Sequence, residues 1–533
     1  MLVLTRDLII TGIFLLAAVL PAALLAGRRR LATVLQLARL ASSAMLLVAL
    51  LAVATTAVTG ADPLAAMASR WPPLALRLDL LGTTMLLMIS LVGFVVTEFS
   101  RRYLEGDPRH GAFVGHLCLT LACACTLAVA GTLGLFWLAW VGTSLSLHRL
   151  LLFYPQRPLA RRAATQEFCI ARVGDVALLG AFLLLARAAG SDDLATIAGL
   201  ARRGALAATD SGVALAAWLI VLAAVLKSAQ FPLHGWLTEV METPTPVSAL
   251  LHAGIVNGGG FLVLRLADVL ITASAPLHAL ALIGAVTALV GSVIMLTQST
   301  IKESLAWSTI SQMGFMLLQC GLGVFPLAWL HILTHSLYKA HAFLSAGSVV
   351  ELAKDEWLPD LRLRPRLPSL LIDMAVALAV YLLAGWLLGV LPDEHAAALV
   401  LGSSTVLGLT LFLSQSRQQR LLPPLFARTL TLVAAAGLFC FALQAAALWV
   451  MRSTLPLKTA VEPFDLAMLV ALLAVFPAIT VAQYLLPTWY GTRVGRSLRV
   501  HLANGLYMHH LVNRLFGALE RTSPQPFTRE SSR

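Results

Sequence analysis

Long apolar runs recur along the whole chain and leave few alternatives for its fold. Each run has about 18–25 residues, the length that a helix needs to cross the hydrocarbon core of a bilayer. Only 12% of the 533 residues are charged, about half the share in a soluble domain. We therefore predict an all-α polytopic membrane protein. About fifteen spans are expected, near residues 8–26, 36–59, 79–99, 111–130, 132–154, 164–187, 211–231, 245–270, 276–297, 301–324, 326–350, 369–391, 396–414, 429–450 and 464–486.

The order of the spans indicates how the chain is divided. Spans four to eight and nine to thirteen have the size of two five-helix inverted repeats, as found in transporters, and we expect at least one discontinuous helix. No loop is long enough for a soluble domain. The expected divisions are N-terminal helices at 1–105, a first proton-channel repeat at 111–270, a second repeat at 276–415, C-terminal helices at 428–490 and an amphipathic cytoplasmic tail at 492–533.

Lys and Arg are distributed unevenly between alternate loops. Short loops rich in these residues stay in the cytoplasm, and the richer set lies at 28–30, 101–109, 157–162, 354–366 and 417–420 and in the tail from Arg493. We expect a multi-pass protein of the bacterial inner membrane with its N-terminus outside and its C-terminus in the cytoplasm. The net charge of +12 follows from this bias, and no nucleic-acid partner is expected. The first run lacks a signal-peptide cleavage pattern.

One stretch, residues 225–261, combines apolar runs with an ionisable group and helix breakers. Lys227 lies at membrane depth, where ionisable groups usually face a wet or protein-lined interior and serve a function. Pro232 should break the helix, and broken helices survive at this depth only beside a cavity or inside protein. We predict that Lys227 transfers protons, with His234 near the break and His252 passing the proton on. The alternative is a Lys that reaches back to the interface.

Three titratable residues share one face of the apolar segment WLHILTHSLYKAHAFL. His331, His335 and Lys339 are spaced at i, i+4 and i+8, so their side chains lie about one helical turn apart. A single buried His is more often only hydrogen-bonded to its neighbours. Three such groups in register predict a proton path, because His takes up and releases protons near neutral pH.

The sixth span carries three charged residues. Arg172 and Asp175 are at i and i+3 and can form an ion pair, and a purely structural pair is an equally good interpretation. Glu167 precedes them and is expected to be the only carboxylate in the preceding membrane stretch that can partner Lys227. In the tenth span, Lys302 begins a polar face that continues with Ser304, Ser308 and Ser311.

The cysteines and glycines predict no cofactor site in this chain. The six Cys lie in apolar runs without metal-ligand spacing, so we expect no metal and no disulfide framework. The run from Gly258 to Gly260 lacks a following Gly-Lys-Ser pattern and is not a nucleotide site. It is expected to let helices approach closely.

Four stretches resemble the antiporter-like proton-translocating subunits of NADH–quinone oxidoreductase and of Mrp-type sodium/proton antiporters. The resemblance implies a discontinuous-helix fold with a central polar axis. It implies proton-path roles for Lys227, His252, His331, His335 and Lys339, with support from Arg172 and Asp175. The stretches are KSAQFPLHGWLTEVMETPTPVSALLHA at 227–253, ARVGD at 171–175, IKESLAWSTISQMGFM at 301–316 and HILTHSLYKAHAFLSAGSV at 331–349.

Two departures from the family pattern concern its charged residues. The family usually has a Glu in the fifth span after a Trp that matches Trp140, but this chain has Val141. We hypothesise that Glu167, one helix later, takes its place. The family also usually has a Lys with an acidic neighbour in the twelfth span, where this chain offers only Asp373, which we expect at the interface.

The tail motif VHLANGLYMHHLVNRL at 500–515 resembles one branch of the family, the membrane subunits of DAB inorganic-carbon accumulation complexes. That resemblance implies a large soluble partner on the cytoplasmic face, of DabA type, which resembles a zinc carbonic anhydrase. Flow of H⁺ or Na⁺ through this chain would drive hydration of CO2 to bicarbonate in the partner, and this chain would not itself be an enzyme. The alternatives are a subunit of a respiratory or hydrogenase-type pump and a subunit of a Mrp-type antiporter.

Overall fold

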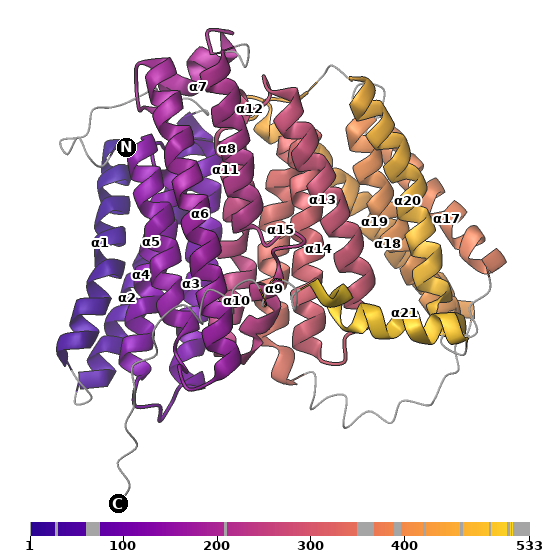
Figure 1. Cartoon of the computed structure of the whole chain (residues 1–533), viewed down its shortest axis with the longest axis horizontal. Coiled ribbons are helices and arrows are strands. Elements are labelled where there is room, and N and C mark those ends of the chain that lie inside the picture. Colours follow the sequence, from indigo (N-terminus) through magenta and orange to yellow (C-terminus); the bar gives the residue numbers. More distant parts are fainter. Residues whose placement is uncertain are drawn as a thin grey trace, which may run out of the picture.

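The computed structural model describes a bundle of helices that lie side by side (Figure 1). Over the described residues the secondary structure is helical apart from two isolated β-bridges, so the predicted all-α fold is confirmed. The described residues are 2–26, 30–59, 75–206, 210–348, 367–387, 396–418, 423–458, 462–489, 492–508, 512 and 514.

The long helices lie lengthwise in the bundle, and consecutive spans lead the chain back and forth between its two ends (Figure 1). The N-terminal half contains α1 Leu2–Ala26, α2 Leu31–Thr59, α3 Leu80–Tyr103, α4 His110–Val129, α5 Leu133–Leu151, α6 Pro158–Ala189, α7 Leu194–Arg202, α8 Ser211–Lys227, α9 Gly235–Glu239, α10 Thr245–Ala253, α11 Gly258–Arg265 and α12 Ala267–Leu270. The remaining helices are α13 Ser274–Met295, α14 Ile301–Gly321, α15 Phe325–Leu344, α17 Leu367–Leu387, α18 Ala396–Gln418, α19 Pro423–Met451, α20 Pro463–Trp489 and α21 Arg493–Ala503.

Ten helices in the described part of the chain are long and apolar enough to cross a membrane. Each of the fifteen predicted spans overlaps a helix. Several of these helices are shorter or more polar than a membrane span requires, so the count of fifteen stays a prediction. The division of the chain into two repeats with flanking helices also stays a prediction.

The seventh predicted span is interrupted, as expected for a discontinuous helix. Helix α8 ends at Lys227, before Pro232, and Ala229 has a φ of 47°, a left-handed conformation that ends helices. Side chains just beyond the helix end bond backbone carbonyls close to it. The Ser228 hydroxyl donates to the Val256 carbonyl at 3.0 Å, and the Gln230 amide donates to the Ser228 carbonyl at 2.7 Å.

The eighth span is interrupted too, which sequence analysis did not predict. Instead of one helix over 245–270, the chain forms α10, a 3₁₀ turn at Ile255–Asn257, α11 and the short helix α12. The Asn257 side-chain amide donates to the Ala253 carbonyl at 3.1 Å, which satisfies a backbone acceptor at the interruption. Two broken helices, α8–α9 and α10–α11, therefore lie next to each other in the core.

The glycine run at the start of α11 allows this close packing, as expected. A Cβ added at Gly259 would lie 2.3 Å from both the Ala224 carbonyl oxygen and the Ser228 hydroxyl oxygen. A Cβ at Gly260 would lie 2.4 Å from the Met316 sulfur. Helix α11 thus packs against α8 at a distance that only glycine permits.

One end of the bundle carries the tail helix. Helix α21 lies across this end, whereas α1 begins at the opposite end (Figure 1). Gly495 and Leu502 of α21 are buried, whereas Val494 and the arginines of this helix are exposed. The predicted tail thus contains a helix over Arg493–Ala503, and its amphipathic, cytoplasmic role stays a prediction. Most of the tail beyond Met508 and the basic cluster at 354–366 lie outside the described residues.

Replacing Gly259 by Ala should destabilise the bundle, because the backbone carbonyl of Ala224 cannot move aside as a side chain could. We expect the free energy of unfolding to fall by about 1–3 kcal/mol, measured by thermal unfolding in mild detergent. Gly134→Ala is the matched control, since no atom lies within 4 Å of a Cβ at that position. Equal melting of the two variants would contradict the packing of α11 on α8.

Candidate functional site

Lys227 is a buried ammonium at the end of a broken helix. The residue is only 9% exposed. Its Nζ lies 5.1 Å from the centre of the Trp140 ring in α5, and no hydrogen-bond acceptor among the described residues lies within reach of it. The aromatic ring stabilises the charge in part. A buried charge also needs a carboxylate or water to offset its lost hydration.

Helix α6 supplies the charges that act on Lys227. Glu167 and Asp175 attract the ammonium and Arg172 repels it. The expected ion pair is present, with Arg172 Nη2 2.8 Å from Asp175 Oδ2. The expectation that Glu167 is the only available carboxylate is therefore wrong. Glu167 and Asp175 are eight residues apart, so they lie near one face of α6, and this face packs on α8.

Glu167 has one oxygen that remains available. Its Oε1 accepts a hydrogen bond from the Ser144 hydroxyl of α5 at 3.0 Å. Its Oε2 is buried and has no hydrogen-bond partner among the described residues. The carboxylate is therefore held between α5 and α6. Glu167 and Lys227 line the same small cavity.

Lys227 and Trp140 stand between two cavities. The smaller cavity, of ≈ 10 Å³, is also lined by Glu167 and Trp236. The larger, of ≈ 50 Å³, extends between α3, α4 and α11 as far as Asn257 and Ile332 and has a mostly apolar lining. A water needs about 10–15 Å³. The smaller cavity is therefore at the lower limit for one water, and the larger cavity exceeds that limit but offers few polar partners.

A direct hydrogen bond continues from the larger cavity to α15. The Asn257 amide donates to the Ser336 hydroxyl at 2.9 Å, and Ser336 follows His335. Sequence analysis did not include Asn257 and Ser336 among the site residues. The available signal was a polar residue directly before the glycine run. Nothing in the sequence pairs it with a serine 79 positions away.

The three titratable residues of α15 share a face, as their spacing predicts. The rings of His331 and His335 lie 5.9 Å apart, and His331 Nδ1 is 3.1 Å from the amide oxygen of Gln319. Lys339 is fully buried, and its Nζ donates to the Leu305 carbonyl at 2.9 Å. The helix therefore presents a row of titratable groups to α14 and α10.

His252 joins this row from α10. Its ring stacks on Phe343 at 4.3 Å between ring centres, and His335 hydrogen-bonds the backbone of His252. Neither ring nitrogen of His252 has a hydrogen-bond partner among the described residues. The structure thus brings His252 beside His335 and Lys339, while Leu250 and Gly254 on either side of it line the larger cavity.

The other predicted site residues lie further from this row. His234 is buried beside the break, between the rings of Phe231 and Trp307 at 5.4 and 4.7 Å. Lys302 lies in the first turn of α14, and its Nζ donates to the Thr245 hydroxyl at 3.1 Å. Lys302 therefore stands at the end of the bundle where α10 begins.

Three predicted polar residues have partners inside the protein. The hydroxyls of Ser304 and Ser311 donate to backbone carbonyls of α13 and its end, so they connect α14 to its neighbour. Asp373 is covered by protein, and its position at the membrane interface stays a prediction. It is fully buried and accepts a hydrogen bond from the Ser414 hydroxyl at 2.8 Å, because α18 packs on α17 and covers it.

One cluster among the described residues has the donor atoms for a metal ion. His278, Glu462 and Asp465 place their ligand atoms within 4.8 Å of one another. However, Lys458 Nζ lies 2.6 Å from Asp465 Oδ2 and already supplies positive charge there. We interpret this cluster as an ion-pair network, which leaves the expectation of no metal in this chain as a prediction.

Two family models match the chain and together cover more than half of it. The model of the NADH:quinone oxidoreductase/Mrp antiporter transmembrane region matches residues 130–392. The model of the NADH-ubiquinone oxidoreductase (complex I) chain 5 N-terminus matches residues 66–114. The chain therefore belongs to the family of antiporter-like membrane subunits of NADH:quinone oxidoreductases and Mrp antiporters, as the resemblance implied.

The curated relatives include named carbon-transporter subunits and named respiratory subunits. The probable inorganic carbon transporter subunit DabB2 of Halothiobacillus neapolitanus is 48% identical over 52% of this chain and 50% of its own length. The NADH-quinone oxidoreductase subunit L of Escherichia coli is 37% identical over 52% of this chain and 45% of its own length. This chain thus spans about half the length of the relatives it matches.

Solved structures support the fold. The Mrp complex from Dietzia sp. DQ12-45-1b contains a chain that matches with a TM-score of 0.63 at 23% identity, over 98% of this chain and 64% of that one. The archaeal membrane-bound sulfane sulfur reductase contains one with a TM-score of 0.58 at 18% identity, over 95% of this chain and 99% of that one. At these identities the likeness extends to the fold alone.

Replacing Glu167 by Gln should abolish ion movement past Lys227, because the charge that faces the ammonium is lost while the shape is kept. The measurement is proton flux into sealed vesicles that contain the intact complex. Glu98→Gln is the control, since Glu98 pairs with Arg101 in a partly exposed site on α3. Unchanged flux in Glu167→Gln would show that Glu167 does not replace the usual fifth-span Glu.

Replacing Asn257 by Leu should slow the same flux, because it removes the polar step from the larger cavity to Ser336. Thr120→Val is the control. Thr120 lines the same cavity, but its hydroxyl donates to its own helix, at the His116 carbonyl. Equal fluxes in the two variants would contradict a route through Asn257.

Proposed function

We propose that this chain is the cation-conducting, most simply proton-conducting, membrane subunit of an inorganic carbon pump. An ion gradient across the inner membrane drives flow through this chain. That flow powers hydration of CO2 to bicarbonate in a soluble, carbonic-anhydrase-like partner that carries the zinc. The chain itself performs no covalent chemistry.

The buried ammonium of Lys227 carries this proposal. It lies between two cavities large enough for water, without a hydrogen-bond acceptor among the described residues and within the field of Glu167 and Asp175. Such a group responds to a proton or cation that arrives beside it, because the attraction between Lys227 and Glu167 changes with the charge on either one. Intramembrane ionisable groups are retained mainly for such functions.

The route that we propose continues from Lys227 along α15. Waters in the larger cavity connect Lys227 to Asn257 and Ser336. His252 and His335 then pass the charge to Lys339, which is buried against the Leu305 carbonyl. The imidazoles of His252 and His335 and the amine of Lys339 can each take up a proton again once they have released one. The amide of Asn257 keeps its own protons, and its role in the route is to orient its neighbours.

The relatives favour carbon transport over respiration. Three relatives named as probable inorganic carbon transporter subunits are 40–48% identical to this chain, while the respiratory subunits are 35–37% identical. The partner is expected at the end of the bundle that carries α21 and the basic loops. This end faces the cytoplasm if the positive-inside bias holds.

A second candidate function is ion exchange within a Mrp-type or respiratory complex. The fold likeness to a chain of a Mrp complex, over 98% of this chain, favours it. A requirement for sodium in transport would support an antiporter, and co-purified redox subunits would support a respiratory pump.

Replacing Lys227 by Ala should abolish carbon accumulation by cells while the complex still assembles, because the ion route loses its responsive charge. The measurement is uptake of labelled inorganic carbon at limiting CO2. Arg187→Gln, which changes an exposed cation at the end of α6, is the control and should accumulate carbon normally. Normal accumulation in Lys227→Ala would remove the mechanism.

The partner is identified by gentle-detergent purification of the tagged chain, followed by mass spectrometry and metal analysis. A large soluble protein with bound zinc is the expected result. Several membrane subunits with iron–sulfur partners would overturn the carbon proposal in favour of a redox-driven pump.

A further inference from the structure

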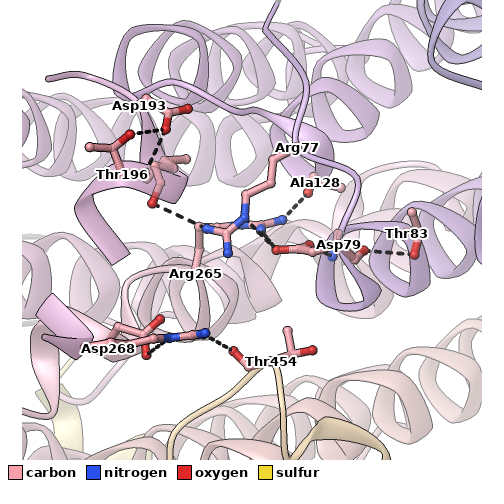
Figure 2. Close-up of polar contacts among 12 residues, drawn as sticks. Arg77, Asp79, Thr83, Ala128, Asp193, Thr196, Arg265, Asp268 and Thr454 are labelled. Carbon is pink, nitrogen blue, oxygen red and sulfur yellow. Dashed lines mark hydrogen bonds and ion pairs between the residues drawn. The ribbon is translucent and has the colours of Figure 1, made fainter. Parts of the chain in front are cut away.

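A buried ion pair lies at the end of the bundle where α3 begins. Asp79 caps α3, with its Oδ1 accepting from the Gly82 N–H at 2.7 Å. Its Oδ2 accepts from Arg265 Nη1 at 2.6 Å and from Arg77 Nε at 2.9 Å. Figure 2 shows the Asp79 carboxylate between the two arginines, which come from α11 and from the segment before α3.

The pair stays charged although it is buried. The Arg265 side chain is 1% exposed and that of Asp79 is 10% exposed. The Asp79 carboxylate lies against the guanidinium groups of Arg265 and Arg77 and accepts from the Gly82 N–H, and all three favour its charged form. The carboxylate is therefore ionised at neutral pH. The presence of a buried ion pair does not by itself show that it stabilises the fold, because packed apolar residues in its place often stabilise a protein equally well.

The guanidinium of Arg265 contacts two residues that line the larger cavity of Lys227, although Arg265 itself does not line it. Its Nη2 donates to the Ala128 carbonyl at 2.7 Å, and its central carbon lies 5.3 Å from the centre of the Phe261 ring. Both Ala128 and Phe261 line that cavity, as does Met85, which is three residues beyond Gly82 on α3. Ala128 and Phe261 therefore contact Arg265 on one side and line the cavity on the other.

Gly82 shows how tightly the guanidinium fills this position. A Cβ at Gly82 would lie 2.7 Å from Arg265 Nη2 and 2.9 Å from the Ala128 carbonyl oxygen. The space between α3, α4 and α11 above the cavity is thus occupied by Arg265, and a larger residue than Gly at position 82 would displace it.

We propose that the Asp79–Arg265 ion pair is the gate at this end of the Lys227 cavity. Closed, it separates the cavity from water at the end of the bundle opposite α21, and the fixed positive charge repels cations. A cation passes when the guanidinium leaves the Ala128 carbonyl. The gate rests on the proposed ion route, since it is the outer end of that route.

The competing explanation is a structural clamp between α3 and α11. A second ion pair at the same end provides the comparison. Arg202 Nε lies 2.9 Å from Asp268 Oδ1, and Arg202 Nη2 donates to the Thr454 carbonyl, as Figure 2 shows for Asp268 and Thr454. Neither Asp268 nor Thr454, the partners of Arg202, lines the cavity of Lys227, whereas Ala128, a partner of Arg265, does line it. Loss of this pair loosens the same end without opening the cavity.

The test measures access to the cavity directly. Met85→Cys is introduced into the full chain after its six native cysteines are replaced, and the intact complex is treated in sealed vesicles with a membrane-impermeant thiol reagent. Asp79→Asn should speed labelling from the α3 end by about tenfold or more, the population change expected from losing a charge-assisted hydrogen bond. Arg202→Gln should leave the rate unchanged.

Two further results bear on the gate. Gly82→Ala keeps every charge but displaces the guanidinium, so it should also speed labelling, which covers the case in which Asp79→Asn fails to fold. Unchanged labelling in both Asp79→Asn and Gly82→Ala, or equal acceleration in Arg202→Gln, would overturn the gate. Labelling does not require transport. Gated labelling together with normal carbon accumulation in Lys227→Ala would therefore refute the proposed function and leave the gate standing.

Discussion

The burial of one ammonium, Lys227, is the constraint on which the rest of the site depends. A charge in a low-dielectric interior needs partners that replace its hydration. Trp140, Glu167 and Asp175 provide the aromatic face and the negative charge, and the two cavities provide room for water. No acceptor among the described residues holds the Nζ of Lys227. The free energy of its charged form therefore depends on the charge of its neighbours. That dependence is what allows an ion elsewhere in the site to act on it.

The broken helices place this ammonium and bring a few polar groups close to it. Helix α8 ends at Lys227, and α10 and α11 are separated by a turn that contains Asn257. Backbone groups freed at these interruptions are bonded by Ser228, Gln230 and Asn257. Glycine at position 259 then lets α11 approach α8. The interruptions after α8 and α10 thus place Lys227 and Asn257, two polar residues, in the lining of the larger cavity.

Local spacing and composition predicted the parts of this site that lie on one element. The i, i+4, i+8 spacing correctly placed His331, His335 and Lys339 on one face, and the Arg172–Asp175 pair followed from an i, i+3 spacing. Contacts between distant elements could not be predicted. Asn257 meets Ser336 and Asp79 meets Arg265 only because α11 packs between α3 and α15. The burial of Asp373 could not be predicted for the same reason, since its cover comes from α18.

The most direct test of the central claim is the proton flux of the purified complex in sealed proteoliposomes, measured from internal pH under an imposed gradient of either sign. The wild-type complex should conduct in at least one direction, and the Lys227→Ala complex, at equal protein density and with its partner bound, should conduct no faster than empty liposomes. Equal flux in the two complexes would show that ions cross this chain without Lys227, and the account of the site would be wrong.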